Sequence, residues 1–86
     1  MYHELKTHEN YFQEVYLLNK TFECRKNDRD FKVYDTLILK EFNPVTNTFS
    51  GREIYCSIRS ILTDEFDGVA KGYCILSIKN INYINQ

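Results

Sequence analysis

The segment Lys20–Phe31, KTFECRKNDRDF, changes character halfway along its length. Its first part, Thr21–Arg25, alternates between apolar and polar residues, which is the period-two pattern of a strand with one buried face. Phe22 and Cys24 are therefore expected to point into a core. The second part, Lys26–Asp30, is polar throughout and predicts a loop. The segment therefore predicts a strand that leads directly into a charged loop.

Before this strand the sequence predicts a helix. The apolar residues of Asn10–Leu18 have the one-sided spacing of an amphipathic helix. Thr7 or His8 precedes it, with Thr7 as the expected N-cap and His8 as a residue of the helix start. Asn19 follows the last apolar residue and is expected in the left-handed conformation that ends many helices. A short strand, Tyr2–Lys6, is expected before the helix.

After the charged loop, alternating residues predict three more strands. They are Thr36–Phe42, Ile54–Leu62 and Tyr73–Ile78. Asn43 and Pro44 start the first connection, and Thr63–Gly72 forms an acidic second one. The tail from Asn80 is expected to fray. This order predicts a mainly β (α+β) fold, a small barrel of about five strands with one main helix after the first strand.

The composition is that of a small globular protein. The 86 residues predict a single domain over residues 1–86, and the hydrophobic fraction of 43% is ordinary for a folded chain. A net charge of −1 lacks the basic excess typical of proteins that hold duplex DNA. No apolar run reaches the roughly 20 residues of a membrane helix, and the N-terminal residues lack the apolar core of a signal peptide. We expect a cytoplasmic protein with no membrane partner.

The cysteines and histidines suggest no metal site. Cys24, Cys56 and Cys74 form no CxxC pair, so they suit neither a disulfide framework nor a zinc site. All three occupy strand positions that alternate with polar residues and are expected to be buried. The histidines lack acidic or thiol partners at ligand spacing. We therefore expect neither a metal nor another cofactor.

The string Lys20–Arg25 also resembles the GxKxxExR signature of ASCH domains, which belong to the PUA-like superfamily of small β-barrels. The likeness is greatest to a branch of short bacterial and phage proteins, and its motifs extend over nearly the whole chain. They are His3–Lys6, Lys20–Arg29, Phe31–Asp35, Leu37–Leu39 and Gly72–Ile78. Two residues depart from the pattern, since Leu18 and Tyr34 stand where glycine is usual.

The resemblance implies a ligand-binding cleft, because PUA-like domains commonly bind RNA or modified nucleotides. Lys20, Glu23 and Arg25 are its candidate residues. Lys20 and Arg25 suit a phosphate or a base carbonyl, whereas Glu23 suits an exocyclic amine or holds the lysine in place. The alternative for these three is a structural cluster of ion pairs on the barrel rim.

Further residues extend this candidate site. Lys26 and Arg29 suit contact with a phosphate, but they equally suit a solvated loop. His3 is either a donor or base of the site or a hydrogen-bonded structural residue. The aromatic residues expected to stack on a base are Tyr34, Tyr55 and Tyr73, and those expected in the core are Tyr11, Phe12, Tyr16 and Phe22.

Three functions are compatible with these residues. The first is binding of RNA or a modified nucleoside in a small pocket. The second is a non-enzymatic phage or bacterial protein that binds a host or regulatory protein. The third is an amidohydrolase of a modified base, an activity of one ASCH relative. Lys20 matches the catalytic lysine of that enzyme, but Glu23 replaces its catalytic threonine, so the resemblance does not transfer the activity.

Overall fold

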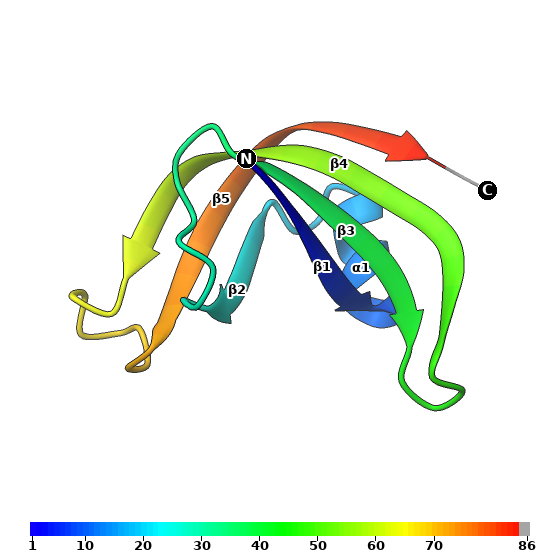
Figure 1. Ribbon diagram of the computed structural model, residues 1–86, viewed down its shortest axis with the longest axis horizontal. Coiled ribbons are helices and arrows are strands. Elements are labelled where there is room, and N and C mark those ends of the chain that lie inside the picture. Colours follow the sequence, from blue (N-terminus) through cyan, green and yellow to red (C-terminus); the bar gives the residue numbers. More distant parts are fainter. Residues whose placement is uncertain (85–86) are drawn as a thin grey trace.

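The computed structural model describes residues 1–84 and contains one five-stranded sheet and one helix (Figure 1). The elements are β1 (Tyr2–His8), α1 (Glu9–Tyr16), β2 (Phe22–Lys26), β3 (Thr36–Asn43), β4 (Thr48–Thr63) and β5 (Tyr73–Ile84). The expected mainly β fold, with five strands and a helix after the first strand, is confirmed.

The sheet curls into a half-barrel whose two edges face each other. Its strand order is β1-β3-β4-β5-β2, with β1 parallel to β3 and the other pairs antiparallel. The edge strands β1 and β2 are therefore the two strands that flank α1 in the chain. Within residues 1–84 no backbone ladder joins β1 to β2. The gap between these edges is where the charged segment lies.

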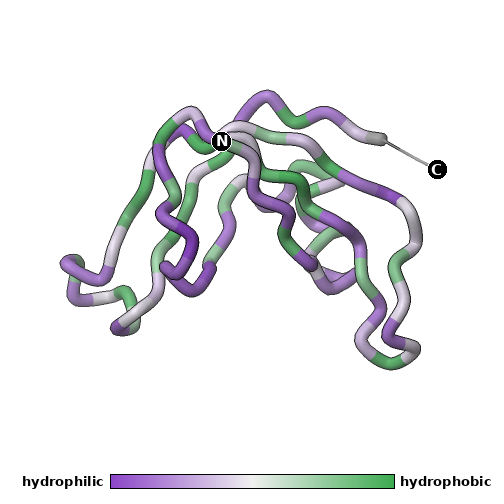
Figure 2. Tube along the Cα trace, in the orientation of Figure 1, coloured by the Kyte–Doolittle hydropathy of each residue, from purple (hydrophilic) through white to green (hydrophobic). Residues whose placement is uncertain are grey.

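The concave side of the sheet carries the apolar core, which α1 covers. Phe12 and Val15 of α1 are fully buried against inward-facing residues of the sheet. Those sheet residues include Leu5, Leu37, Leu39, Ile54, Ile58 and Leu76. Figure 2 shows the segment between β2 and β3 as largely hydrophilic, in contrast to the green stretches of the strands.

The ends of α1 differ from the expectation. The helix begins at Glu9 with His8 as N-cap, and Thr7 is a buried strand residue rather than a cap. At the other end Leu18, not Asn19, has the left-handed backbone, with φ of 62°. The amides of Asn19 and Lys20 then donate to the carbonyl of Glu14, at 2.9 and 3.1 Å. This turn directs the chain into the candidate site.

Both positions at which ASCH domains usually have glycine adopt a glycine-like backbone in this chain. Leu18 has φ of 62° and Tyr34 has φ of 76°. Residues other than glycine rarely adopt a positive φ, because their Cβ atom then comes too close to the neighbouring carbonyl oxygen. The Tyr34 amide donates to the carbonyl of Ile58 at 2.7 Å, so β4 holds this turn in place.

The inward face of β2 is the opposite of the one expected. Glu23 is only 2% exposed, whereas Phe22 and Cys24 are exposed on the outer side. The register explains this, because Glu23 pairs with Leu76, a core residue of β5, and directly paired residues share a face. Burial of a charged residue instead of Phe22 is possible only because its charge is neutralised, as described below.

The last two strands are longer than expected. β4 begins at Thr48 because the turn before it is tight, with φ of 58° at Asn47. β5 runs past Ile78 to Ile84, so residues 80–84 form a strand instead of a frayed tail. The same expectation for residues 85–86 falls outside the described residues. No helix in residues 1–84 is long and apolar enough to cross a membrane.

Candidate functional site

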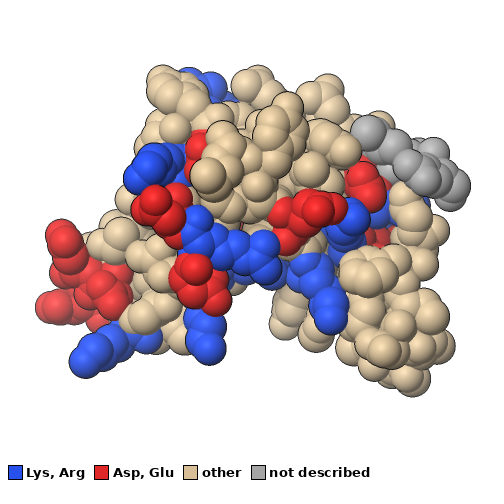
Figure 3. Space-filling view, viewed as in Figure 1, with Lys and Arg blue, Asp and Glu red and all other residues tan. Residues whose placement is uncertain are grey.

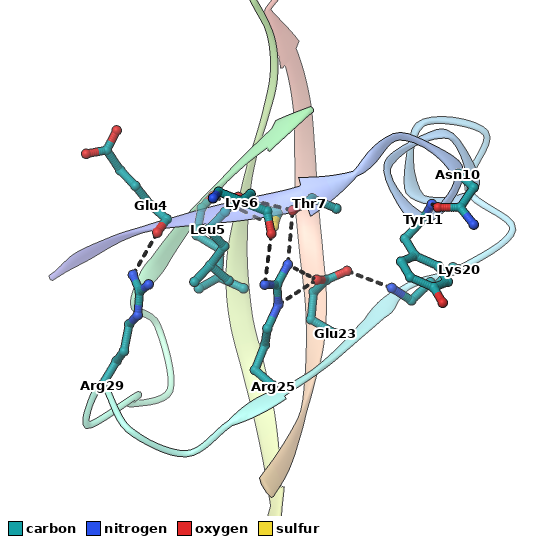
Figure 4. Close-up of polar contacts among 12 residues, drawn as sticks. Glu4, Leu5, Lys6, Thr7, Asn10, Tyr11, Lys20, Glu23, Arg25 and Arg29 are labelled. Atoms are coloured by element: carbon teal, nitrogen blue, oxygen red, sulfur yellow. Dashed lines mark hydrogen bonds and ion pairs between the residues drawn. The ribbon is translucent and has the colours of Figure 1, made fainter. Parts of the chain in front are cut away.

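Glu23 lies at the centre of a charged cluster inside the half-barrel (Figure 4). Its Oε1 accepts hydrogen bonds from Nε and Nη2 of Arg25, at 3.1 and 2.9 Å. Its Oε2 accepts one from Nζ of Lys20 at 2.8 Å. Burial of a carboxylate is costly unless it is paired and hydrogen-bonded, and these charge-assisted contacts meet both conditions.

Arg25 also connects β2 to β1. Its Nη1 donates to the carbonyl of Lys6 and its Nη2 to Oγ1 of Thr7, each at 3.0 Å. The Thr7 hydroxyl in turn donates to the carbonyl of Leu5 at 3.1 Å. The guanidinium therefore spans the gap between the two edge strands and has a fixed orientation.

A cleft opens beside this cluster, between the end of β1, the start of α1 and β2. Its volume of about 390 Å³ lies in the range of small-molecule sites, about 300–1,000 Å³. The cleft is lined by Lys6, Thr7, His8, Tyr11, Lys20, Glu23, Cys24 and Arg25. The three residues implied by the signature thus meet in one cleft.

An aromatic residue forms one wall of the cleft. Tyr11 is 55% exposed and stacks on His8, with ring centroids 6.4 Å apart and planes 12° apart. Nζ of Lys20 lies 5.5 Å from the ring centroids of both Tyr11 and Phe22. The expectation that Tyr11 and Phe22 belong to the core is wrong, since the core reaches the helix through Phe12 and Val15.

A second, smaller cavity adjoins the cleft. It has a volume of about 140 Å³ and is lined by Leu5, Arg25, Lys26, Asp28, Arg29 and Phe31. Nη1 of Arg29 donates to the carbonyl of Glu4 at 2.7 Å. Arg25 lines both cavities, so Lys26 and Arg29 lie next to the signature residues.

His3 lines neither cavity, although it packs against Phe31, which lines the smaller one. It is 5% exposed, and its Nε2 lies 2.8 Å from Oδ2 of Asp35. Its ring meets Phe31 edge-on at 4.8 Å. The hydrogen bond from His3 holds the pKa of Asp35 below its ordinary value, with further support from the amide of Lys32. These contacts fit the alternative in which His3 is a hydrogen-bonded structural residue.

None of the tyrosines expected to stack on a base lines the cleft or the smaller cavity. Tyr73 pairs with Lys26 across β2 and β5, but it lines neither cavity. Tyr34 lies below the guanidinium of Arg59, whose Cζ is 5.2 Å from the ring centroid. Tyr55 is part of a shallow depression on another part of the sheet.

All three cysteines are free, but they differ in exposure. Cys56 and Cys74 are buried as expected, and burial raises both pKa values, that of Cys56 to about 12. Cys24 is exposed and lines the cleft, so the expectation for it is wrong. The cause is the reversed face of β2. Residues 1–84 contain no group of three His, Cys, Asp or Glu side chains placed to hold a metal ion.

Sequence reasoning missed several residues of the cleft. Thr7 continues the alternation of His3 and Leu5, so a first strand extended beyond Lys6 places its side chain inward. Tyr11 lies on the exposed side of the helix that Phe12 and Val15 define. The cleft depends on where β1 ends and α1 begins, and this boundary was predicted two residues too early in β1.

The family model described as "Domain of unknown function (DUF3850)" matches residues 2–78. The chain belongs to the DUF3850 family. Every residue that lines the cleft and the smaller cavity lies within this DUF3850 domain. One relative is the "Uncharacterized 12.9 kDa protein in GpA 3'region" of Escherichia phage P2, which is 41% identical over 59 residues. The match covers 69% of this chain and 52% of the relative, so the chain spans about half the length of the curated relative.

Proposed function

We propose that this DUF3850 protein is an ASCH-type, PUA-like domain that binds a nucleoside or an RNA nucleotide in the cleft beside Lys20, Glu23 and Arg25. One observation carries the proposal. The cleft combines a hydrogen-bonding cluster, Glu23 with its two cations, and an exposed aromatic ring, Tyr11. A nucleobase offers the matching pair of surfaces, a π face and a polar edge.

The cluster has hydrogen-bonding capacity left for a ligand. Glu23 accepts three hydrogen bonds and is only 2% exposed, so it orients its two cations, whose side chains are 19% and 24% exposed. The ammonium of Lys20 donates one hydrogen bond, to Glu23, and has further N–H groups to offer. A base edge can therefore contact the ion pairs without breaking them, which keeps the buried carboxylate neutralised.

Size and charge support a small ligand. A protein that binds duplex nucleic acid neutralises many phosphates and is strongly basic. This chain has a net charge of −1, and its cleft is of small-molecule size. Both features fit a single nucleotide, or one residue of a single-stranded RNA, better than a helix.

The position of Thr7 favours binding over hydrolysis. Thr7 contributes an aliphatic hydroxyl to the cleft, but the side chain is 2% exposed. The hydroxyl donates its proton to the carbonyl of Leu5 and accepts from Arg25. A nucleophilic hydroxyl needs a base within hydrogen-bonding distance, and neither partner is one.

Titration of the chain with ribonucleosides and short single-stranded RNAs, followed by NMR, tests the proposal. We expect amide shifts at Tyr11, Lys20 and Glu23. Loss of the aromatic wall in Tyr11→Leu should weaken binding by about tenfold, since stacking on one base contributes about 1–3 kcal/mol. The matched control is Tyr73→Leu, a similarly exposed tyrosine outside the cleft.

Two results would contradict the proposal. Absence of any shift in the cleft would favour the alternative of a protein that binds a host or regulatory protein. A larger effect of Tyr73→Leu than of Tyr11→Leu would move the stacking surface to the outer side of β5. Conversion of acetylated cytidine, measured by mass spectrometry, would instead support hydrolysis.

A further inference from the structure

We infer that the smaller cavity beside the cleft is a phosphate subsite, so that the ligand is a nucleotide or a short single-stranded nucleic acid rather than a free nucleoside. The inference rests on the proposed function, because it extends the same ligand along the gap between β1 and β2. It assigns a role to Lys26 and Arg29, which the cleft itself does not use.

The gap between the edge strands holds two arginines in neighbouring positions. Arg25 donates to the carbonyl of Lys6 at 3.0 Å and Arg29 to that of Glu4 at 2.7 Å. These carbonyls are two residues apart in β1, which is roughly 7 Å along a strand. Figure 4 shows both guanidinium groups on the same side of β1. The two groups therefore form adjacent binding positions, one at the cleft and one at the smaller cavity.

Basic residues predominate along this gap. The two cavities are lined by five basic residues and two acidic ones, Lys6, Lys20, Arg25, Lys26 and Arg29 with Glu23 and Asp28. In Figure 3 Lys and Arg side chains gather near the middle of the face, where Figure 1 shows the space between β1 and β2. The local excess is positive although the chain as a whole has a net charge of −1.

Part of this excess has no counter-charge among the described residues 1–84. Lys20 and Arg25 are paired with Glu23. Among residues 1–84, Lys26 and Arg29 form no ion pair, although Asp28 also lines the cavity. An anion in the smaller cavity would supply the missing charge. The carboxylate of Asp28 opposes the anion, so the two cations have to outweigh it.

The size of the cavity and its donors fit a phosphate. A volume of about 140 Å³ is below the range of whole small-molecule sites, so it suits one compact group. Arg29 uses one N–H group on Glu4 and has others left for a bidentate contact, the geometry in which guanidinium binds phosphate. Because Glu4 already orients this guanidinium, little side-chain freedom is lost on binding.

Arg25 connects the subsite to the cleft. Among residues 1–84 it is the one residue that lines both cavities, so its side chain alone separates a group in one cavity from a group in the other. A base in the cleft and the phosphate of the same or the next nucleotide would occupy the two cavities together. Free inorganic phosphate would fill only the smaller cavity. Titration with inorganic phosphate and with nucleotides therefore distinguishes the two sources of the anion.

NMR titrations of the full chain with four kinds of probe test the inference. The probes are the ribonucleosides, their 3′- and 5′-monophosphates, dinucleotides such as UpU and ApA, and inorganic phosphate. We expect a monophosphate or dinucleotide to bind about tenfold more tightly than the nucleoside at low salt. Added salt should reduce this advantage, because it screens the attraction between the phosphate and the exposed cations of the subsite.

Two variants and two controls assign the gain to the subsite. Arg29→Gln and Lys26→Gln should each reduce the advantage of the phosphate and leave nucleoside binding unchanged. The controls are Arg59→Gln and Lys71→Gln, which change exposed residues that line neither cavity. Both should retain the tighter binding of the ligand that carries a phosphate. Thermal unfolding of all four variants shows whether they are folded. Lys26→Gln does not remove the hydrogen bond from Arg29 to the carbonyl of Glu4, so it tests the charge without changing this contact to β1.

The outcomes separate the inference from the proposed function. If nucleosides and nucleotides bind equally well, the subsite is wrong and the proposed function stands. If inorganic phosphate shifts the amides of Lys26 and Arg29 but no nucleoside or nucleotide shifts that of Tyr11, the subsite stands and the proposed function is wrong. If no probe causes a shift, both are wrong.

Discussion

Oδ2 of Asp35 lies 2.8 Å from Nε2 of His3, and this contact joins β1 to the residue that precedes β3. Asp35 also accepts a hydrogen bond from the amide of Lys32 at 3.1 Å. The carboxylate thus holds the end of the charged loop against the strand that forms the cleft. Asp35→Ala should lower the free energy of unfolding at neutral pH by about 2 kcal/mol. Urea denaturation measures it, and an unchanged midpoint would contradict the structural role of the pair.

The same carboxylate predicts a pH dependence. The pKa of Asp35 is below its ordinary value of 3.8, chiefly because of the hydrogen bond from His3. Its contribution is therefore complete above pH 3.8 and is lost as the pH falls through the lowered pKa of the folded state. We expect denaturation midpoints, measured from pH 6 down to about pH 2.5, to fall less steeply in Asp35→Asn than in the wild type. Parallel profiles would contradict the shifted pKa.

The charged cluster predicts an order of stabilities. Arg25→Ala leaves the 2% exposed Glu23 with Lys20 alone and should cost about 3 kcal/mol. Glu23→Gln should cost less, about 1–2 kcal/mol, because the side chains of Lys20 and Arg25 are 19% and 24% exposed and can contact water. Chemical denaturation of both variants checks the order. The reverse order would mean that Arg25 does not neutralise Glu23.

The left-handed backbone of Leu18 predicts a stabilising glycine. Leu18 is 59% exposed, so Leu18→Gly loses few contacts and relieves the strain of φ at 62°. We expect a gain of about 0.5–1 kcal/mol in the free energy of unfolding. Leu17→Gly is the control, since this neighbour is similarly exposed but has φ of −86°, and it should be destabilised. Equal effects of the two glycines would contradict the assigned backbone.

The cysteines predict selective alkylation. Cys24 is exposed, whereas Cys56 is buried and its pKa is raised to about 12, which suppresses the reactive thiolate. Iodoacetamide should modify the folded chain once, at Cys24, as mass spectrometry with peptide mapping can show. Because Cys24 lines the cleft, a bound nucleotide should slow the reaction. Equal modification of Cys56 would indicate that the core opens.

The element order and the grouping of Lys20, Glu23 and Arg25 were predictable from the sequence. Alternation marks the strands, and the three residues lie close together in one segment, so a single strand and the turn before it bring them together. Their arrangement inside the barrel was not predictable. An apolar Phe22 beside a charged Glu23 favours the wrong inward face, and only the register with Leu76 decides it.

The other half of the cleft depends on contacts between distant segments. Thr7 and Tyr11 join the site because β1 extends to His8 before α1 begins, and element boundaries are the least certain part of sequence-based prediction. Glu4 and Lys6 enter through their backbone carbonyls, which no side-chain pattern reveals. Long-range pairing thus determines which surfaces of the signature segment are exposed.

The two guanidinium contacts to β1 have a consequence for association between molecules. The unpaired edge of a sheet invites a strand from another chain. At the edge of β1, the carbonyls of Glu4 and Lys6 are already occupied by Arg29 and Arg25. An incoming strand has to displace two charged groups, one of them anchored by a buried carboxylate. The residues proposed to hold the ligand therefore also keep this curled sheet from templating its own aggregation.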